Sequence, residues 1–405
     1  MHQTRHILIA GAGIGGLTAA LCLARLGLRV TLLERSKVLQ EAGAGLQISP
    51  NASAILRELG LLPALAADAL VPSAISVRRG RNGATLARLP LADAEARWGA
   101  PYLLLHRGDL QRALVAAVLQ EPNIALATDS TLAGFAVTER GVTLAVRHGA
   151  IRVTYEGDGL IGADGLRSLV RERLSEGAAP PPAQAQRVAF RALVDPQRVP
   201  AAMRQPESML WLGPHAHVVH YPLRGGRVVN VVAVVDATTA IDWQTEFWSQ
   251  PATPADVGRR FARFDQRLRD LVAAAETWRR WPLVERPPLA SWSQGPVTLL
   301  GDAAHPMLPF LAQGAAQAIE DAAALAGALA AHGAIGAAFA AYESQRMARA
   351  NRVQAQSHRQ AGIYHLAGPA ALARNLAMQM LGPARLIEQY DWLYRLPPAR
   401  GAAAL

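Results

Sequence analysis

Short apolar runs and one glycine-rich turn alternate at the start of the chain. His6–Ala10 is an apolar run of five residues, and Arg29–Glu34 is a second run of the same kind. Between them, the glycines that begin at Gly11 lead into a helical pattern that continues to Leu26. A strand, a glycine turn, a helix and a second strand within about 30 residues predict a parallel βαβ unit.

The same periodicity predicts the elements that follow. Helical spacing of apolar residues predicts helices over 50–70, 106–119, 256–278, 313–358 and 371–396. Alternating runs bounded by glycine or proline predict strands over 74–91, 131–139, 142–147, 151–155, 187–194, 208–212, 217–222, 228–235 and 297–300. Nucleotide-type elements therefore lie at both ends of the chain, and an antiparallel sheet is inserted between them. This arrangement predicts an α/β fold.

Composition agrees with a soluble enzyme. A chain of 405 residues favours two domains. The net charge is +10, but the arginines are scattered and Lys37 is the only lysine. We therefore expect no nucleic-acid partner, and we expect the diffuse positive field to attract anionic ligands such as carboxylates and dinucleotide phosphates.

One cysteine, Cys22, excludes an internal disulfide and a cysteine-based metal site. Cys22 lies between leucines in the first predicted helix, where a buried and inert thiol is expected. No uninterrupted apolar run reaches the length of about 18 residues that a membrane span needs. The sequence predicts a cytoplasmic protein without a bound metal or a membrane segment.

A GxGxxG pattern follows the first strand. Gly11 allows the tight turn, Gly13 lets the backbone approach a pyrophosphate, and Gly16 permits close packing of helix on strand. Glu34 ends the second strand, where a carboxylate accepts hydrogen bonds from a ribose diol. The alternative is a structural glycine turn next to a surface glutamate. The strand, helix and acid in sequence favour a dinucleotide site.

Two later turns carry further candidate chemistry. A second GxGxxG at 157–162 leads into a strand, so it does not open a helix over a phosphate. It is followed by GADG, in which Asp164 is expected to face solvent before a helix that starts at Ser168. The strand at 297–300 ends in Gly301-Asp302, where Asp302 is placed to bind a sugar hydroxyl. A helix then opens at Gly314, and its free amides at 314–316 suit a negatively charged group of a bound cofactor.

These motifs resemble those of the single-component FAD-dependent aromatic hydroxylases, which include the salicylate, 3-hydroxybenzoate and 6-hydroxynicotinate hydroxylases. The resemblance spans residues 6 to about 345. It implies a Rossmann-type FAD-binding domain, like that of para-hydroxybenzoate hydroxylase, with an inserted antiparallel-sheet substrate domain and a C-terminal helical tail. We expect the FAD-binding domain at 1–73, 101–178 and 283–362, the substrate sheet at 74–100 and 179–282, and the tail at 363–405.

The resemblance also implies which residues bind FAD and the transient reductant, NADH or NADPH. The ADP half is assigned to the glycine fingerprint, Glu34 and the adjoining Arg35, and the pyrophosphate or ribityl chain to Arg107. The GADG turn is expected to serve both cofactors. The residues expected beside the flavin ring and ribityl chain are Gly45, Leu46, Gln47, Asp302, Gly314, Ala315 and Ala316.

The reaction implied by the resemblance is hydroxylation of a small phenolic or hydroxylated aromatic acid by O2, through a flavin C4a-hydroperoxide. Such a site needs a base near the substrate hydroxyl and must exclude water. His217 and Tyr221 share one face of a predicted strand, and we expect His217 to act as base or relay and Tyr221 to bond the substrate. The alternative is that both are ordinary half-buried strand residues. Pro309 is expected to shape the oxygen pocket.

Other interpretations stay open. His305 is expected to have a structural role, and Arg191 is a candidate for a substrate carboxylate or for an interface. Another flavoenzyme on the same fold, an epoxidase or a reductase of an apolar substrate, is an alternative to the hydroxylase. A third hypothesis is a basic protein that retains the fold but binds nucleic acid or a membrane surface, and the scattered arginines disfavour it. A homodimer through the sheet domain or the tail is also expected.

Overall fold

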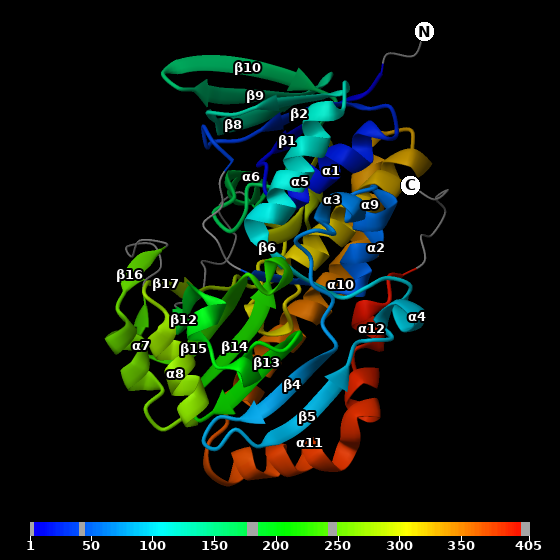
Figure 1. Cartoon of the computed structure of the whole chain (residues 1–405). Helices are drawn as coiled ribbons and strands as arrows, with labels where there is room; N and C mark the ends of the chain where they lie inside the picture. Colours follow the sequence, from blue (N-terminus) through cyan, green and yellow to red (C-terminus); the bar gives the residue numbers. More distant parts are fainter. Residues whose placement is uncertain (1–3, 40–44, 176–184, 242–248, 398–405) are drawn as a thin grey trace.

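A computed structural model of the chain describes residues 4–39, 45–175, 185–241 and 249–397. In these residues, a six-stranded sheet and an eight-stranded sheet form the two halves of the molecule, in the upper and lower parts of Figure 1. The C-terminal part of the chain is mostly helical. The predicted α/β fold class, with a second, mostly antiparallel sheet and a helical tail, is confirmed.

The six-stranded sheet has the order β18-β19-β11-β1-β2-β7, with β18 alone antiparallel to its neighbour. Its strands are β18 (Ser293–Gln294), β19 (Val297–Leu299), β11 (Gly159–Gly162), β1 (His6–Ala10), β2 (Arg29–Leu33) and β7 (Ile124–Ala127). A parallel sheet must be covered on both faces. Helices α1 (Ile14–Ala24), α5 (Arg107–Gln120) and α9 (Gly314–Ala331) cover one face.

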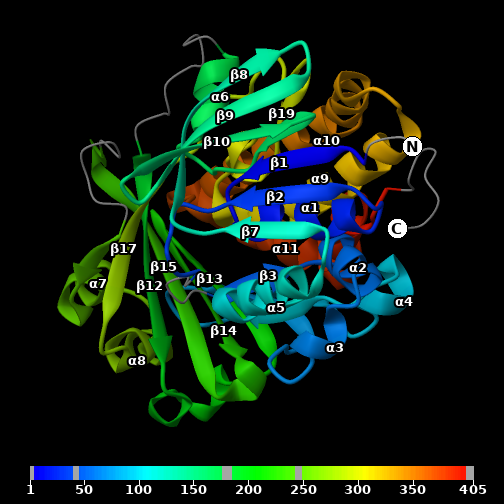
Figure 2. The same cartoon turned by 90° about the horizontal axis from the view of Figure 1, so that it is seen from above.

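A three-stranded meander covers the other face of this sheet, as Figures 1 and 2 show. It consists of β8 (Ser130–Thr138), β9 (Gly141–His148) and β10 (Ile151–Gly157), all antiparallel. These three strands had been predicted within one or two residues of their ends. Every residue of α1 is buried between the sheet and its neighbouring helices, which explains why this helix carries no charged side chain.

The eight-stranded sheet has the order β16-β17-β12-β15-β14-β13-β4-β5. Its strands are β16 (Gln250–Ala252), β17 (Trp278–Leu283), β12 (Ala185–Val194), β15 (Val228–Ile241), β14 (Ala216–Leu223), β13 (Glu207–Gly213), β4 (Ala74–Arg79) and β5 (Thr85–Pro90). All neighbouring pairs are antiparallel except β4 and β13, which are parallel. The expectation of a wholly antiparallel sheet is corrected at this one pair.

Helices cover both faces of the eight-stranded sheet. On one face, α7 (Pro254–Arg260) and α8 (Gln266–Ala274) pack on a buried apolar cluster. On the other lie α10 (Ile335–Tyr364) and α11 (Gly368–Glu388), and α11 runs along β5 (Figure 1). A two-stranded sheet of β3 (Gly45–Ile48) and β6 (Leu103–His106) lies between the halves of the molecule. The remaining helices are α2 (Pro50–Glu58), α3 (Leu62–Leu65), α4 (Ala94–Trp98), α6 (Leu169–Leu174) and α12 (Asp391–Tyr394).

Several predicted helices are shorter than expected. The helix predicted over 50–70 ends at Glu58, because Gly60 takes a left-handed conformation with φ of +72°. The helix predicted over 256–278 is two helices, since the Asp265 side chain caps a new helix at Arg267. Trp278, expected to end that helix, instead begins β17.

A buried histidine makes the stability of this sheet sensitive to acid. His220 on β14 is fully buried, neither ring nitrogen has a hydrogen-bond partner among the described residues, and burial lowers its pKa to about 3. Because the unfolded chain binds a proton at this histidine below a pH of about 6.5 and the folded chain does not, stability falls as the pH falls through that value.

We expect His220→Leu to reduce the acid sensitivity. Between pH 7 and pH 5, the loss of unfolding free energy should be smaller in the variant than in the wild type by about 2 kcal/mol. Urea unfolding at the two pH values measures this difference. An equal loss in both proteins would contradict a neutral, buried His220.

Candidate functional site

The turn between β1 and α1 has the shape that a pyrophosphate site requires. Gly11 has a φ of +104°, and a Cβ atom on Gly11 would overlap the carbonyl oxygen of Ala163. A Cβ on Gly16 would overlap the carbonyl oxygen of Gly11, so this glycine allows the close packing that the sequence predicted. A Cβ on Gly13 would meet no atom within 4 Å. Open space therefore adjoins the start of α1 at Gly13.

The first amides of α1 are available for a ligand. Gly13 occupies the N-cap, no side chain caps this end, and the first turn contains no acidic residue. Glu34, at the end of β2, is fixed beside this turn because its carboxylate accepts hydrogen bonds from the Ala12 amide at 3.0 Å and the Ser36 amide at 2.8 Å. Arg35 is exposed next to it. The cradle, the helix end and the acid suit the ADP half of a dinucleotide.

The GADG turn differs from expectation in one respect. The Asp164 carboxylate does not face solvent: its Oδ2 accepts hydrogen bonds from the amides of Leu169 and Val170, at 2.7 and 3.3 Å. Ser168 caps α6 by accepting a bond from the Arg171 amide, as predicted. The Asp164 Oδ1 is buried without a hydrogen-bond partner in the described chain, and burial raises the pKa of this carboxyl. An unpartnered buried oxygen here suits a ligand hydroxyl.

Asp302 and the start of α9 lie side by side. Asp302 is exposed in a 3-10 turn, Gly301–Ala303, after β19, and a Cβ on Gly314 would lie 3.9 Å from its Oδ1. Helix α9 has no acidic residue in its first turn and no side-chain cap. The amides of Gly314, Ala315 and Ala316 are therefore directed at the region that Asp302 borders, where a helix N-terminus favours negative charge.

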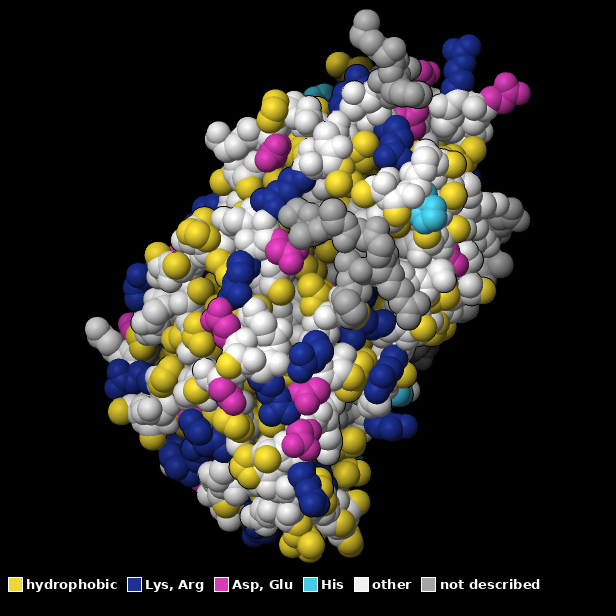
Figure 3. All heavy atoms as spheres, turned by 90° about the vertical axis from the view of Figure 1, so that its right-hand side faces the viewer, with side chains coloured by type: hydrophobic (Ala, Val, Ile, Leu, Met, Phe, Trp, Pro, Cys, Tyr) yellow, Lys and Arg dark blue, Asp and Glu magenta, His cyan; other side chains and the backbone are white. Residues whose placement is uncertain are grey.

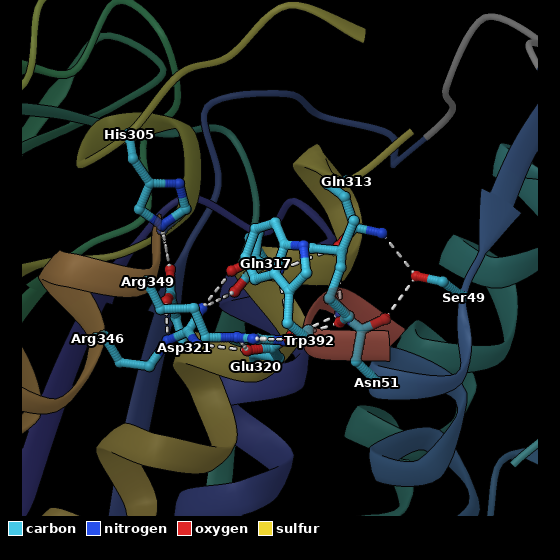
Figure 4. Close-up of polar contacts among 12 residues, drawn as sticks. Ser49, Asn51, His305, Gln313, Gln317, Glu320, Asp321, Arg346, Arg349 and Trp392 are labelled. Atoms are coloured by element: carbon cyan, nitrogen blue, oxygen red, sulfur yellow. Dashed lines mark hydrogen bonds and ion pairs between the residues drawn. The ribbon is translucent and has the colours of Figure 1, made fainter. Parts of the chain in front are cut away.

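A buried charged network holds the loop that carries Asp302 (Figure 4). The Asp321 carboxylate accepts hydrogen bonds from the Gly301 amide at 3.0 Å and from His305 Nε2 at 2.6 Å, and it pairs with Arg346 at 2.8 Å. Arg346 also pairs with Glu320, and all four side chains are buried. The structural role expected for His305 agrees with these contacts.

The network extends to α2 and to the tail. Glu320 Oε1 accepts a hydrogen bond from Asn51 at 2.5 Å, while Gln313 donates to Ser49 at 2.7 Å. Arg349 bonds Glu320 and the backbone carbonyls of Trp392 and Leu393. Figure 4 shows Ser49 and Asn51 on one side and His305 on the other. One polar cluster thus fixes α2, α9, α10 and α12 around the loop that ends at α9.

Strand β3 connects the two halves of the molecule. The Gly45 amide donates to Asn230 Oδ1 at 2.9 Å, and a Cβ on Gly45 would lie 2.6 Å from the Tyr221 ring and hydroxyl. Leu46 is half-buried in the same strand. Gln47 accepts a hydrogen bond from the Tyr102 hydroxyl at 2.9 Å. Gly45 is therefore required for the close approach of β3 to the eight-stranded sheet.

An arginine lies near Tyr221. Arg191 on β12 is half-buried, and desolvation together with the positive charge of Arg107 lowers its pKa. Its guanidinium lies 5.3 Å from the Trp281 ring centroid. Arg191 is not among the residues that line the cavity described next.

A cavity of about 360 Å³ lies between the eight-stranded sheet, the loop at 309–312 and α11. Its wall includes His217, Pro309, Gln47, Tyr102 and Arg374. Its size suits a small ligand, for which pockets span about 300–1,000 Å³. A hollow of about 390 Å³ between α7 and α8 is lined mostly by apolar and small residues, and none of the candidate site residues lines it. We therefore assign the site to the first cavity.

The two predicted substrate residues do not share the cavity. His217 lines it, but Tyr221, on the same face of β14, is not among its lining residues and instead packs against Gly45. His217 is buried beside the rings of Phe310 and Tyr364, whose centroids lie 5.2 and 5.3 Å from its own. Burial, together with His365 and Arg187, lowers the pKa of His217 well below its usual value. The imidazole is therefore neutral at pH 7.

Sequence reasoning did not identify three side chains around this cavity. His365 follows α10, and its Nε2 lies 2.8 Å from His217 Nδ1. Asp236 on β15 bonds His365 Nδ1 at 2.6 Å. Arg374 on α11 lines the cavity without a carboxylate partner among the described residues. These residues are isolated polar positions in helix and strand patterns, and no local motif marks them.

The surface gives no sign of a nucleic-acid site on the face drawn in Figure 3, where basic, acidic and apolar side chains are interspersed. In the described part of the chain, no helix has both the length and the apolar character needed to cross a bilayer.

Comparison with known proteins agrees with this geometry. The FAD binding domain family matches residues 4–357. The chain is 39% identical to 3-amino-4-hydroxybenzoate 2-monooxygenase PtnB3 of Streptomyces platensis over 97% of this chain and 96% of that protein. It is 35% identical to 3-hydroxybenzoate 6-hydroxylase of Polaromonas naphthalenivorans over 96% and 95% of the two chains.

A solved structure shows the same fold. HpxO of Klebsiella pneumoniae, an R204Q variant in complex with FAD, superposes with a TM-score of 0.85 at 24% identity, over 97% of this chain and 99% of that one. The turn at Gly13, the ends of α1 and α9 and the unpartnered Asp164 oxygen all fit FAD. The chain belongs to the family of single-component FAD-dependent aromatic hydroxylases, as its sequence motifs predicted.

Proposed function

We propose that this protein uses NADH or NADPH and O2 to hydroxylate a small aromatic acid that already carries a hydroxyl group. The observation that supports this proposal is the cavity beside Pro309, whose wall combines the neutral His217 with Arg374, for which the described residues provide no carboxylate partner. A phenolic acid offers one group to each. The hydroxybenzoates in the names of the two relatives are compounds of this class.

Each group has a separate task in this proposal. Bound FAD supplies the redox chemistry, which takes electrons from the nicotinamide and activates O2. His217 accepts the proton of the substrate hydroxyl, because a phenolate is the more electron-rich form of the ring. The apolar rings of Phe310 and Tyr364 beside His217 help to keep water out. Pro309 lines the cavity and is proposed to shape the space in which O2 reacts.

The cofactor contacts are also proposals. The ADP half is assigned to Gly11, Gly13, Gly16, Glu34 and Arg35, and the pyrophosphate or ribityl chain to Arg107 and Asp164. The flavin ring and ribityl chain are assigned to Gly45, Leu46, Gln47, Asp302, Gly314, Ala315 and Ala316. Tyr221 is retained as a residue that positions β3 beside the flavin. A hydrogen bond from Tyr221 to the substrate is not part of this proposal, because Tyr221 is not among the residues that line the cavity.

The nicotinamide cofactor has no second dinucleotide fold in the described chain, so it is proposed to bind transiently beside the flavin. A cytoplasmic location is part of the proposal. Burial raises the pKa of Cys22 to about 12, which keeps this thiol unreactive. A homodimer through α11 is proposed because Leu372, Leu376 and Met380 are 64%, 58% and 77% exposed at helical spacing.

Anaerobic flavin reduction tests the proposed function. The holoenzyme is mixed with NADH or NADPH in the presence of hydroxybenzoates, aminohydroxybenzoates, hydroxynicotinates and apolar alkenes. We expect one hydroxylated aromatic acid to accelerate reduction and to be hydroxylated when O2 is admitted. Acceleration by an alkene alone would favour the epoxidase or reductase, and no acceleration by any aromatic acid would contradict the proposal.

Arg374 is expected to bind the substrate carboxylate. Among the described residues, its guanidinium bonds the carbonyls of Ile363 and Tyr364 and the Asn375 side chain, and none of these groups carries a negative charge. A hydrogen bond to a charged group contributes about 2 kcal/mol, or roughly 30-fold in affinity. Arg374→Met should raise KM for the acid by about that factor.

The neutral amide of the same acid provides the control. Its KM should change less than about threefold in Arg374→Met, because no charge is lost from the contact. Equal changes for the acid and the amide would show that Arg374 only supports the cavity wall.

A further inference from the structure

Three side chains form a continuous hydrogen-bonded chain that begins at the cavity wall. His217 Nδ1 lies 2.8 Å from His365 Nε2, and His365 Nδ1 lies 2.6 Å from Asp236 Oδ1. The two histidine side chains are almost fully buried, whereas the Asp236 side chain is 31% exposed. The chain therefore leads from the cavity to the surface through a histidine that lies 148 residues from His217.

The carboxylate determines which nitrogen of each ring carries a proton. Asp236 can only accept, so His365 donates from Nδ1 and its Nε2 is a lone-pair acceptor. His217 must then donate from Nδ1, which leaves a lone pair on its Nε2. A base that removes a phenolic proton needs such a lone pair on the nitrogen that accepts the proton. The arrangement thus prepares His217 for proton acceptance before any substrate is bound.

The surroundings of His217 prevent it from keeping a proton. Burial lowers its pKa, and His365 and Arg187 lower it further. Phe310 and Tyr364 are the other rings packed on it, and neither supplies a negative charge. His365 is also buried, with a lowered pKa, and Asp236 is the carboxylate that bonds it within the described residues. A proton that arrives at His217 must therefore move on.

Building on the proposed function, we propose that His217, His365 and Asp236 form a proton relay that carries the substrate's hydroxyl proton from the cavity to solvent. The substrate O–H bond breaks as His217 Nε2 takes the proton. His217 Nδ1 passes its proton to His365 Nε2, and His365 Nδ1 passes its own to Asp236, which releases it to water. One proton leaves the phenol, one enters solvent, and the phenolate remains in the cavity.

Proton release on ligand binding tests the relay without any redox step. The oxidised holoenzyme is mixed in weak buffer, in the presence of a pH-indicator dye, with 3-hydroxybenzoate or with the panel acid that most accelerates flavin reduction. His365→Gln keeps hydrogen-bonding groups but cannot exchange a proton between two nitrogens. We expect it to slow proton release at least about tenfold, with partial recovery in added imidazole. Asp236→Asn should slow release as well, because the final acceptor is lost.

His215→Asn provides the matched control. His215 bonds the other oxygen of Asp236 at 3.1 Å, is 72% exposed and lies outside the relay. It has a φ of +57°, which asparagine tolerates. Proton release in this variant should stay within about twofold of the wild type.

The outcomes separate the relay from the proposed function. Unchanged proton release in both His365→Gln and Asp236→Asn, with FAD content preserved, would overturn the relay and leave the hydroxylase proposal standing. A wild-type enzyme whose flavin reduction responds to no aromatic acid would overturn the proposed function, and the relay with it.

Discussion

Replacing Gly13 with aspartate is expected to lower the affinity for FAD at least about 100-fold while the apoprotein stays folded. A Cβ atom at this position would meet no protein atom within 4 Å. Aspartate is a favourable N-cap residue, so it would cap the free amides of α1 and stabilise the apoprotein slightly. The same carboxylate would stand where the pyrophosphate binds. Like charges about 4 Å apart repel by about 4 kcal/mol near a protein surface, more than the 100-fold loss requires.

Measurement of flavin content after purification and titration of the apoprotein with FAD provide the readout. Gly13→Ala, which adds no charge, should lose less affinity than Gly13→Asp. Gly16→Ala is a different control, because its Cβ would overlap the Gly11 carbonyl oxygen and should destabilise the apoprotein itself. Full FAD content in Gly13→Asp would show that the cofactor does not pass this glycine.

The second large effect is expected at Arg346. Substitution by methionine keeps much of the side-chain volume but leaves Glu320 and Asp321 buried with one cation fewer. Removal of one partner from a buried ion pair costs about 3–5 kcal/mol. We expect this loss in the free energy of unfolding of the apoprotein, measured by urea denaturation. Because Asp321 also holds Gly301 and His305, FAD affinity should fall in the same variant.

An exposed ion pair provides the comparison. Arg259 pairs with Asp256 at 2.6 Å, with side chains that are 73% and 47% exposed. Arg259→Met should cost less than about 1 kcal/mol. Similar losses in the two variants would mean that the buried network contributes no more than a surface contact.

The sequence predicted the first βαβ unit almost to the residue. The predicted strand His6–Ala10 coincides with β1, and Arg29–Glu34 extends one residue beyond β2. Here the apolar runs are buried on both faces, and Gly11 and Gly16 each meet a steric demand, so local pattern and tertiary structure agree. Helices over 50–70 and 256–278 were predicted too long, because apolar spacing continues across turns that Gly60 and Asp265 create.

The substrate side of the site was less predictable. His217 was predicted from its strand and lines the cavity, but His365, Asp236 and Arg374 belong to segments that meet only in the folded chain. Tyr221 shares a strand face with His217, yet β3 covers it at Gly45. The periodicity of a strand predicts on which face of the sheet a side chain lies, but not which segment packs on that face. Asp164 was expected in solvent because a turn usually is exposed, whereas its carboxylate folds back onto α6.

Helix α11 lines the cavity but carries none of the residues assigned to FAD. It contributes Arg374, Ala377, Met378 and Leu381 to the cavity wall, whereas the turns assigned to FAD lie elsewhere, within residues 4–357, which the FAD binding domain family matches. Mutations in this helix alter the shape and charge offered to a substrate without touching the glycine turn, the GADG turn or the start of α9. Substitutions in α11 can therefore change which substrate the cavity accepts while the residues assigned to FAD stay the same.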